Sequence, residues 1–157
     1  MNYHLDRIPV VRDITTAEML SEMFPAVVTA GPSAIEVNWD HPNHMVESFP
    51  DITHPISGPQ IEQVKRLLTF GQENSGRILV HCHAGVSRST AIAIGIMLVR
   101  GYTPEQSVNA IHDTHPDGHE FWPNELIIQH LETIFDLPDN SIKRLLKNKR
   151  TYLQYAR

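Results

Sequence analysis

Apolar residues along the chain occur in two patterns, short continuous runs and longer segments in which they recur at helical spacing. The short runs predict strands. Ile8–Arg12 and Ala26–Ala30 are β-branched runs, and Arg77–His81 is an apolar run typical of a buried strand. The region from Gly31 to Pro59 is rich in proline and is expected to be mostly loop. Two further candidate strands within it are Ile35–Trp39 and Met45–Phe49.

Longer segments with apolar residues three and four positions apart predict helices. Gln60–Gly71 puts its apolar residues on one face and ends in a glycine that suits a C-cap. Ser89–Gly101 is apolar on nearly every side, which predicts a central buried helix closed by its last glycine. A short helix is expected after Thr15, which forms a capping box with Glu18. Three more helices are expected at Thr103–Asp113, Asn124–Phe135 and Asp139–Tyr155.

The order of these elements indicates a fold class. Strands concentrate in the first half and helices in the second, with a strand–loop–helix at the junction, which is typical of an α/β domain. We therefore expect a central, mainly parallel β-sheet of about four to five strands flanked by α-helices. No internal repeat or low-complexity linker interrupts the pattern, so residues 1–157 are expected to form a single domain.

Composition narrows the class of protein. The 157 residues are 41% hydrophobic and 20% charged, as in a soluble globular protein. The formal net charge of −5 argues against a nonspecific binder of nucleic acid or of a membrane surface, since both need a basic face. The start lacks the order of a signal peptide, and the longest apolar run, Ala91–Val99, is too short to span a bilayer. With a single cysteine suited to a reducing compartment, we expect a cytoplasmic protein that is monomeric by default.

The stretch RILVHCHAGVSRST, residues 77–90, holds the only cysteine of the chain, Cys82. The loop Cys82–Arg88 joins a buried strand to an apolar helix, so its amides and the helix N-terminus can stabilise an anion. Gly85 gives the backbone the freedom that a tight cradle needs. The planar guanidinium of Arg88 suits two oxygens of a phosphate. The pattern therefore predicts a phosphate-binding loop.

Cys82 is the expected nucleophile of this loop. A free thiol is mostly protonated at neutral pH, but a helix N-terminus and nearby cations lower thiol pKa values to roughly 3.5–7.5. As a thiolate, Cys82 would attack the phosphorus of an anion held by Arg88, and Ser89 would donate a hydrogen bond to the sulfur. The alternative is a small buried cysteine at a strand end, which accounts for neither Gly85 nor Arg88.

These residues match His-Cys-x5-Arg-Ser/Thr, so the chain resembles the cysteine-dependent protein tyrosine phosphatases, in particular their small dual-specificity branch. The likeness extends from about Val46 to Leu131. It implies two-step hydrolysis of a phosphate monoester through a phosphocysteine, with an aspartate as general acid and with no metal or other cofactor. It also implies that the loop residues bind the substrate phosphate, namely His83, Ala84, Gly85, Val86, Ser87 and Arg88.

The resemblance places the general acid on a loop before the helix and strand that lead to the cysteine. Asp51 in ESFPDITHP has this position, and the step needs a carboxylic acid held protonated near the leaving group. Asp40 in NWDHP is a competing candidate, and Asp113 and Asp117 are weaker ones. Asp51 could instead be a loop residue that makes a turn after Pro50.

Two further residues are expected to support the loop. His81 lies on a strand and points away from the side chain of Cys82, and the resemblance implies that it orders the loop through hydrogen bonds. Asn124, in WPNELIIQHL, resembles a residue that braces the signature loop from a helix start, although a plain N-cap is an equal alternative.

Histidines close in sequence raise the question of a metal site. His112, His115 and His119 have a spacing that could suggest one, but Pro116 and Gly118 break any helix that would align them. We expect a surface loop bordering the active site and no metal. The segment DHPNH, residues 40–44, has the same interpretation.

Three functions remain open. The leading one is a phosphatase acting on phosphotyrosine, with or without phosphoserine and phosphothreonine, in a phosphorylated protein or peptide. The second is the same chemistry on a phosphoinositide, a nucleotide or an RNA 5′ phosphate, which the absence of lysine in the loop and the net charge disfavour. The third is a phospho-ligand binding module without catalysis, against which the intact Cys82, Arg88 and Ser89 argue.

Overall fold

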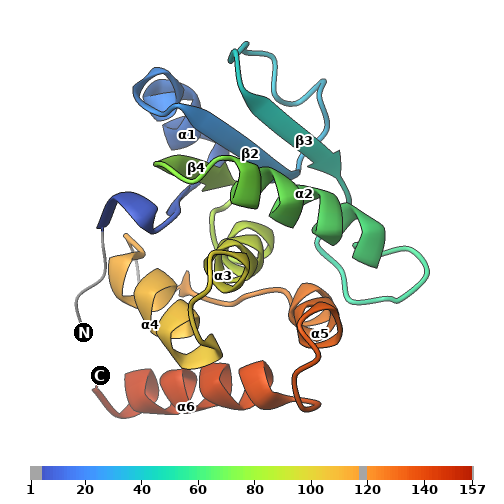
Figure 1. Ribbon diagram of the computed structural model, residues 1–157, viewed down its shortest axis with the longest axis vertical. Helices are drawn as coiled ribbons and strands as arrows, with labels where there is room; N and C mark the ends of the chain where they lie inside the picture. Colours follow the sequence, from blue (N-terminus) through green and yellow to red (C-terminus); the bar gives the residue numbers. More distant parts are fainter. Residues whose placement is uncertain (1–4, 117–119, 157) are drawn as a thin grey trace.

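Within residues 5–116 and 120–156, the part of the chain that the computed structural model describes, parallel strands form one sheet with helices on both faces (Figure 1). The order across this four-stranded sheet is β1-β4-β2-β3, and all three pairings are parallel. The expected α/β class with a mainly parallel sheet is therefore confirmed. The strands are β1 (Val10–Arg12), β2 (Ala26–Gly31), β3 (His44–Ser48) and β4 (Ile78–His81).

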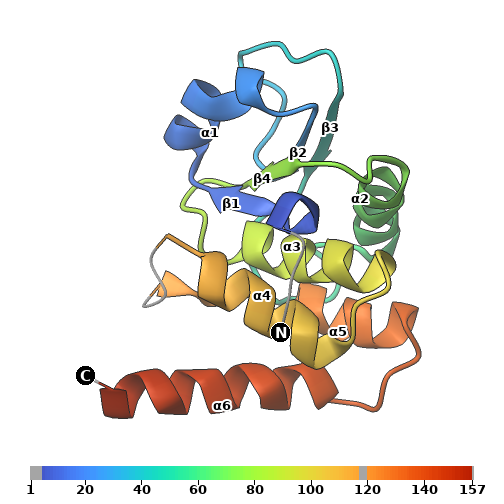
Figure 2. The ribbon, with the colours of Figure 1, turned by 60° about the vertical axis from the view of Figure 1, so that its left-hand side comes forward.

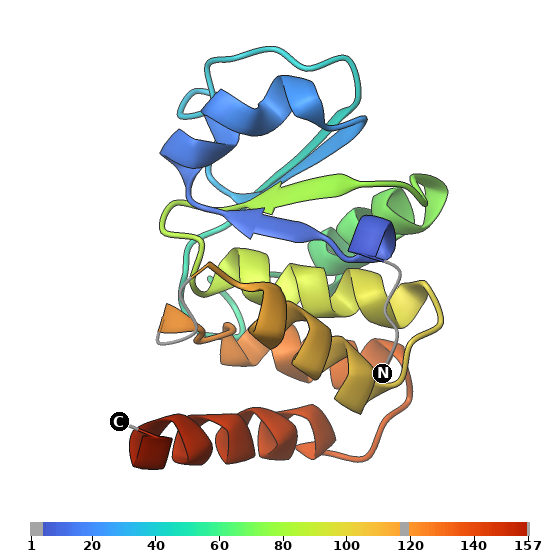
Figure 3. The same cartoon turned by 90° about the vertical axis from the view of Figure 1, so that its left-hand side faces the viewer.

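The helices divide unequally between the two faces. Figure 3 shows α1 on one side of the sheet and the longer helices on the other, with α6 farthest from the strands. In Figure 2, α6 runs along the outer side of α4 and α5. No helix of the described residues is long and apolar enough to cross a membrane. The helices are α1 (Ile14–Leu20), α2 (Ile61–Glu73), α3 (Arg88–Val99), α4 (Pro104–Thr114), α5 (Glu125–Ile134) and α6 (Ser141–Ala156), with 3-10 turns at Leu5–Arg7 and Ser21–Met23.

The two central strands are buried on both faces, which explains why their sequences are almost continuously apolar. Successive side chains of a strand point to opposite faces. Val27 and Leu79 accordingly pack with Ala17 of α1, whereas Val28 and Val80 belong to the larger core on the side of α3. This alternation holds β4 between two packed layers.

The central helix α3 is buried along almost its whole length, as its sequence predicts. The helix ends before Gly101, whose φ of +96° suits a glycine, so the predicted end is confirmed. The predicted C-cap at Gly71 is wrong: α2 runs on to Glu73 and its C-cap is Asn74. A Cβ at Gly71 would lie 2.7 Å from Cγ1 of Ile96, so this glycine lets α2 and α3 approach closely.

Two other local predictions are wrong. The N-cap of α1 is Asp13, whose carboxylate accepts from the amide of Thr16, because the helix begins before the predicted cap Thr15. The segment Ile35–Trp39 is not a strand. A turn forms there because Ser33 and Glu36 bond each other reciprocally through side chain and amide. The predicted strand Met45–Phe49 corresponds to β3, and the capping box of Thr103 with Gln106 opens α4 as expected.

The parallel order brings the carboxyl ends of all four strands to one edge of the sheet. His81 is in register with Arg12 of β1 and with Thr29 of β2. The segments after these ends carry the residues Asp13, Phe49 and Cys82. In open α/β sheets, ligands bind at this edge, so the fold places the predicted loop where a site is expected.

Candidate active site

Cys82 lies directly after β4, at the bottom of the signature loop, residues 82–88, and only 2% of its surface is exposed. Its Sγ is 3.1 Å from Oγ of Ser89, and the amide of Gly85 donates to it over 3.3 Å. Both groups therefore lie within hydrogen-bonding distance of the sulfur. The structure thus brings the predicted nucleophile and Ser89 into direct contact.

The carbonyl groups of the signature loop are turned outward by donors around it. The oxygen of His83 accepts from the amide of Ile14, and that of Val86 accepts from the amide of Trp122. The oxygen of Ser87 accepts from the amide of Asn124. In a trans peptide the N–H points opposite to the C=O, so the amides that follow these carbonyls point into the loop. The loop therefore presents amide donors to its centre, as an anion cradle requires.

Gly85 lets the loop close against the sheet. Its φ is +72°, and a Cβ there would lie 2.8 Å from the carbonyl carbon of Arg12 and from the amide nitrogen of Asp13. Any other residue here would be strained, because of the positive φ and because its Cβ would meet the backbone of Arg12 and Asp13. The loop is therefore held on the junction between β1 and α1.

Arg88 is buried, and Nη1 of its guanidinium donates to the carbonyl of Phe49 over 2.7 Å. The side chain lies against Gly31, whose φ is +113°, and a Cβ at that position would be 2.3 Å from Nη1. The other guanidinium N–H groups make no hydrogen bond within the described residues, so they remain able to bind oxygens of a phosphate.

Asp51 is joined to the signature loop although it is far from it in sequence. Its Oδ1 accepts from Oγ of Ser87 at 2.7 Å and from Nδ2 of Asn124 at 2.9 Å. Asn124 is also the N-cap of α5, accepting from the amide of Ile127, so the bracing and capping geometries coexist. No hydrogen bond links Asp40 to the loop in the described part of the chain, and Asp117 lies outside the described residues.

Behind the loop, a chain of polar groups reaches from Cys82 to the edge of the sheet. Nδ1 of His81 is 3.0 Å from the carbonyl oxygen of Cys82, and its Nε2 is 2.7 Å from Oγ1 of Thr29. The same hydroxyl is 2.6 Å from Nε2 of His44, whose ring stacks on Trp39 with 5.0 Å between ring centroids. Thr29 and His81 are fully buried.

The direction of these hydrogen bonds follows from the groups at each end. A carbonyl only accepts, so Nδ1 of His81 is the donor, and burial lowers the pKa of His81 so that its Nε2 carries no proton. Thr29 must then donate its one hydroxyl proton to His81 and accept from His44. Burial, with smaller contributions from His81 and His41, lowers the pKa of His44 to about 4, which leaves that ring neutral and able to donate. His81 is thereby locked in the tautomer that holds the peptide of Cys82.

We predict that Thr29→Val lowers kcat/KM roughly tenfold, because a buried acceptor that loses its donor costs about 1–3 kcal/mol. The rate at which iodoacetamide alkylates Cys82 should also fall. Thr29→Ser keeps the hydroxyl and should restore both values. Thr69→Val, which removes an exposed hydroxyl on α2, is the control. Equal values for Thr29→Val and Thr29→Ser would contradict the positioning role.

The rim of the loop carries an acidic partner. Nε2 of His83 lies 2.7 Å from Oε1 of Glu36, and both side chains are about half exposed. Hydrogen bonds from the amide of Ser33 and from His83 lower the pKa of Glu36, so this carboxylate is ionised beside the cradle at neutral pH.

The histidine segment at the end of α4 reaches the loop at one residue, and His112 lies in the last turn of the helix rather than in the predicted surface loop. Nε2 of His115 is 2.7 Å from the carbonyl of Gly85, whereas His112 contacts Asp113. His119 lies outside the described residues. Among those described, no three His, Cys, Asp or Glu side chains are grouped so as to hold a metal ion.

Sequence reasoning missed several residues that shape this site. Gly31 ends a buried strand, and such a glycine signals close approach of another group. Thr29 and His44 gave no signal, because a threonine on a strand and a histidine near prolines are individually ordinary. Glu36 was hidden in a segment taken for a strand. Each of these roles depends on a partner distant in sequence.

The solved structures that this fold resembles include phosphatases. Human DUSP28 superposes with a TM-score of 0.64 at 13% identity, covering 98% of this chain and 98% of that chain. The Yvh1 phosphatase domain from Chaetomium thermophilum gives 0.58 at 17% identity, covering 83% and 92%. PTPMT1 in complex with PI(5)P gives 0.57 at 17% identity, covering 93% and 97%. No protein-family model and no curated sequence matches the chain.

These likenesses show that the chain has the fold of the small dual-specificity and tyrosine phosphatases. The resemblance noted in the sequence is therefore confirmed at the level of the fold.

Proposed function

We propose that this protein is a cysteine-dependent phosphatase that hydrolyses phosphate monoesters on phosphotyrosine, with or without phosphoserine and phosphothreonine, in protein substrates. One observation carries the proposal: three groups that the reaction needs all belong to the signature loop or are bonded to it. The thiol of Cys82 lies at the bottom of the loop, the guanidinium of Arg88 is anchored beside it, and the carboxyl of Asp51 is bonded to the loop.

In the first step, the loop amides and Arg88 hold the three non-bridging oxygens of the phosphate. Sγ of Cys82 attacks phosphorus, and the bond from phosphorus to the leaving oxygen breaks. That oxygen takes a proton from Asp51. Because Oδ1 of Asp51 already accepts two hydrogen bonds, Oδ2 is the oxygen that carries this proton.

In the second step, a water molecule attacks phosphorus and its proton passes to the carboxylate of Asp51. The sulfur leaves with the electron pair of the S–P bond, and the hydroxyl of Ser89 stabilises it by a hydrogen bond. Inorganic phosphate is released, and both the thiolate and the protonated Asp51 are restored. The loop amides and Arg88 also stabilise the charge on the phosphate oxygens in each transition state.

The rim favours a substrate with a single phosphate. Glu36 places a negative charge beside His83, and no lysine lies in the signature loop, so a polyanion would meet repulsion at the entrance. A phosphoinositide is the second candidate, because PTPMT1, which shares this fold, has been crystallised with PI(5)P.

Phosphate release from p-nitrophenyl phosphate, three peptides phosphorylated on Tyr, Ser or Thr, and a short-chain phosphoinositide tests both candidates. We expect turnover of the aryl phosphate and the phosphotyrosine peptide, with inhibition by vanadate, a phosphate analogue. A preference for the phosphoinositide would replace the protein substrate by a lipid. No turnover of any of these by folded protein would refute a phosphatase.

A further inference from the structure

A hollow of about 340 Å³ opens on the side of the signature loop where the leaving group must lie. Asp51 and Ser87 line it, together with Trp122 and Asn124. In the proposed reaction, Asp51 gives its proton to the leaving oxygen, so the rest of the substrate extends from this carboxyl. The hollow therefore receives the first atoms beyond the phosphate ester.

This hollow continues into a second and larger one. A groove of about 490 Å³ lies between α5 and α6, and its lining includes Thr53, Pro123 and Glu125, which also line the first hollow. We call this second hollow the α5–α6 groove. Its volume is in the range of pockets that bind small molecules or side chains. A substrate seated at Cys82 has a continuous path from the acid into this groove.

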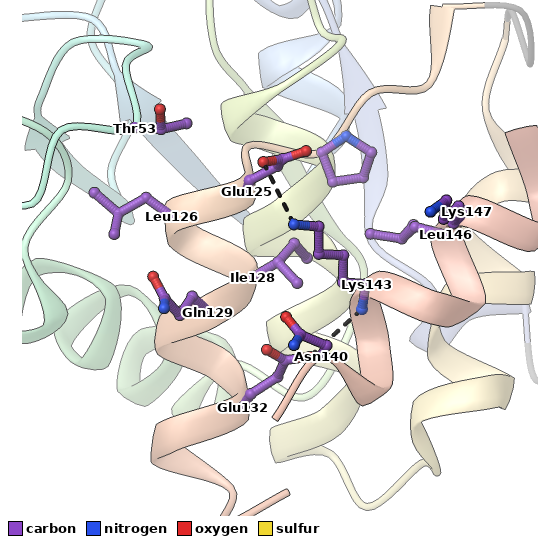
Figure 4. Close-up of a pocket in the computed structure, with 11 residues that line it drawn as sticks. Thr53, Glu125, Leu126, Ile128, Gln129, Glu132, Asn140, Lys143, Leu146 and Lys147 are labelled. Atoms are coloured by element: carbon purple, nitrogen blue, oxygen red, sulfur yellow. Dashed lines mark hydrogen bonds and ion pairs between the residues drawn. The ribbon is translucent and has the colours of Figure 1, made fainter. Parts of the chain in front are cut away.

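The lining of the α5–α6 groove combines apolar and charged side chains. Its apolar residues Leu126, Ile128 and Leu146 are buried, and the last two belong to the main core. Figure 4 shows Lys143 extending from α6 toward Glu125, and Lys147 lies one turn further along the same helix.

Lys143 is the charge best placed to meet a substrate. Its Nζ is 4.0 Å from the carboxylate of Glu125, and both side chains are more than half exposed. An exposed pair at this separation contributes little, so Lys143 can exchange this partner for an anion of the substrate. Glu132 does not compete, because its carboxylate is buried and accepts from the amides of Ile142 and Lys143 at the start of α6.

We propose that the α5–α6 groove binds the polypeptide next to the phosphorylated residue, with an apolar side chain against Ile128 and Leu146 and an acidic side chain at Lys143. The proposal rests on the proposed function. Its occupant is a peptide because the groove continues from the acid and combines apolar lining residues with cations. It makes the groove a determinant of which phosphorylated sites are hydrolysed.

Two phosphotyrosine peptides test this, one with an apolar and a glutamate residue beside the phosphotyrosine and one with lysine in place of the glutamate. Lys143→Glu should raise KM for the glutamate peptide roughly three- to tenfold and lower it for the lysine peptide, as expected for a reversed surface charge. The rate constant kcat for each peptide and the hydrolysis of p-nitrophenyl phosphate should not change, since neither depends on the groove.

Lys65→Glu is a matched control, because Lys65 is also half exposed, pairs with Glu62 at 3.5 Å and lies on α2 outside the groove. Binding of the same two peptides with a non-hydrolysable phosphonate in place of the phosphate separates the groove from catalysis. Loss of the charge preference in Lys143→Glu supports the groove whether or not the protein turns over substrate. Unchanged binding of both peptides would refute the groove even if aryl phosphate is hydrolysed. A change for a short-chain phosphoinositide, but not for the peptides, would also refute it.

Discussion

Replacing Cys82 with serine is expected to reduce phosphate release from p-nitrophenyl phosphate by at least about a thousandfold, because removing the nucleophile of a covalent mechanism removes the whole pathway. A serine hydroxyl keeps the size of the side chain and its contact with Ser89, but it is a far weaker nucleophile without a base beside it. The measurement is the initial rate of p-nitrophenol release at saturating substrate.

The signature loop should survive this change. The Cys82→Ser protein is expected to bind the phosphonate peptides with an affinity close to that of the unmodified protein, because Arg88 and the loop amides are intact. Cys82 is the only cysteine, so alkylation by iodoacetamide in the unmodified protein reports on this side chain alone. Turnover within tenfold of the unmodified protein would remove Cys82 from the reaction.

The fold and the centre of the site could be predicted because both depend mainly on residues that are close together in the sequence. The β-branched run before Cys82 and the apolar run after Ser89 define a strand and a helix, and parallel packing then fixes where the loop between them lies. The spacing of Cys82, Gly85 and Arg88 by itself indicates a phosphate-binding loop. These features need no partner from elsewhere in the chain.

The surroundings of the site could not be predicted, because they depend on contacts between distant segments. The link from His81 through Thr29 to His44 joins three strands, and nothing in any one of them indicates it. The contact of Glu36 with His83 depends on a turn where a strand was expected. The predicted N-cap of α1 is Thr15, whereas the structure has Asp13, because an aspartate two positions earlier is an equally suitable cap.

The sequence offers two main candidates for the general acid, Asp51 and Asp40, and only Asp51 is hydrogen-bonded to the signature loop in the described part of the chain. Both Asp51 and Asp40 lie in loops before the strand that leads to Cys82. The residues around them do not show which carboxyl group is closer to the signature loop. In the structure, Asp51 is one hydrogen bond from the loop through Ser87, and a second one from Asn124 fixes its orientation. Whether this geometry serves proton transfer is decided by substitution.

Asp51→Asn is expected to lower kcat roughly 10²–10⁴-fold, the range in which a positioned general acid contributes. Asparagine is isosteric and keeps an oxygen to accept from Ser87 and Asn124, so the loop should stay in place. The loss should be larger for a phosphotyrosine peptide than for p-nitrophenyl phosphate, because nitrophenolate leaves more easily without a proton. Asp40→Asn is the matched control and should leave both rates unchanged.

The pH dependence of kcat gives a second and independent measure of the same role. A general acid works only while protonated, so the activity of an enzyme that uses one falls as pH rises. Asp51→Asn has no proton to lose, so its activity should stay level over that range and approach the activity of the unmodified protein at high pH. An alkaline limb that persists in Asp51→Asn but disappears in Asp40→Asn would transfer the acid to Asp40. In that case Asp51 would be a residue that holds Ser87 and Asn124 together, and its substitution would change KM more than kcat.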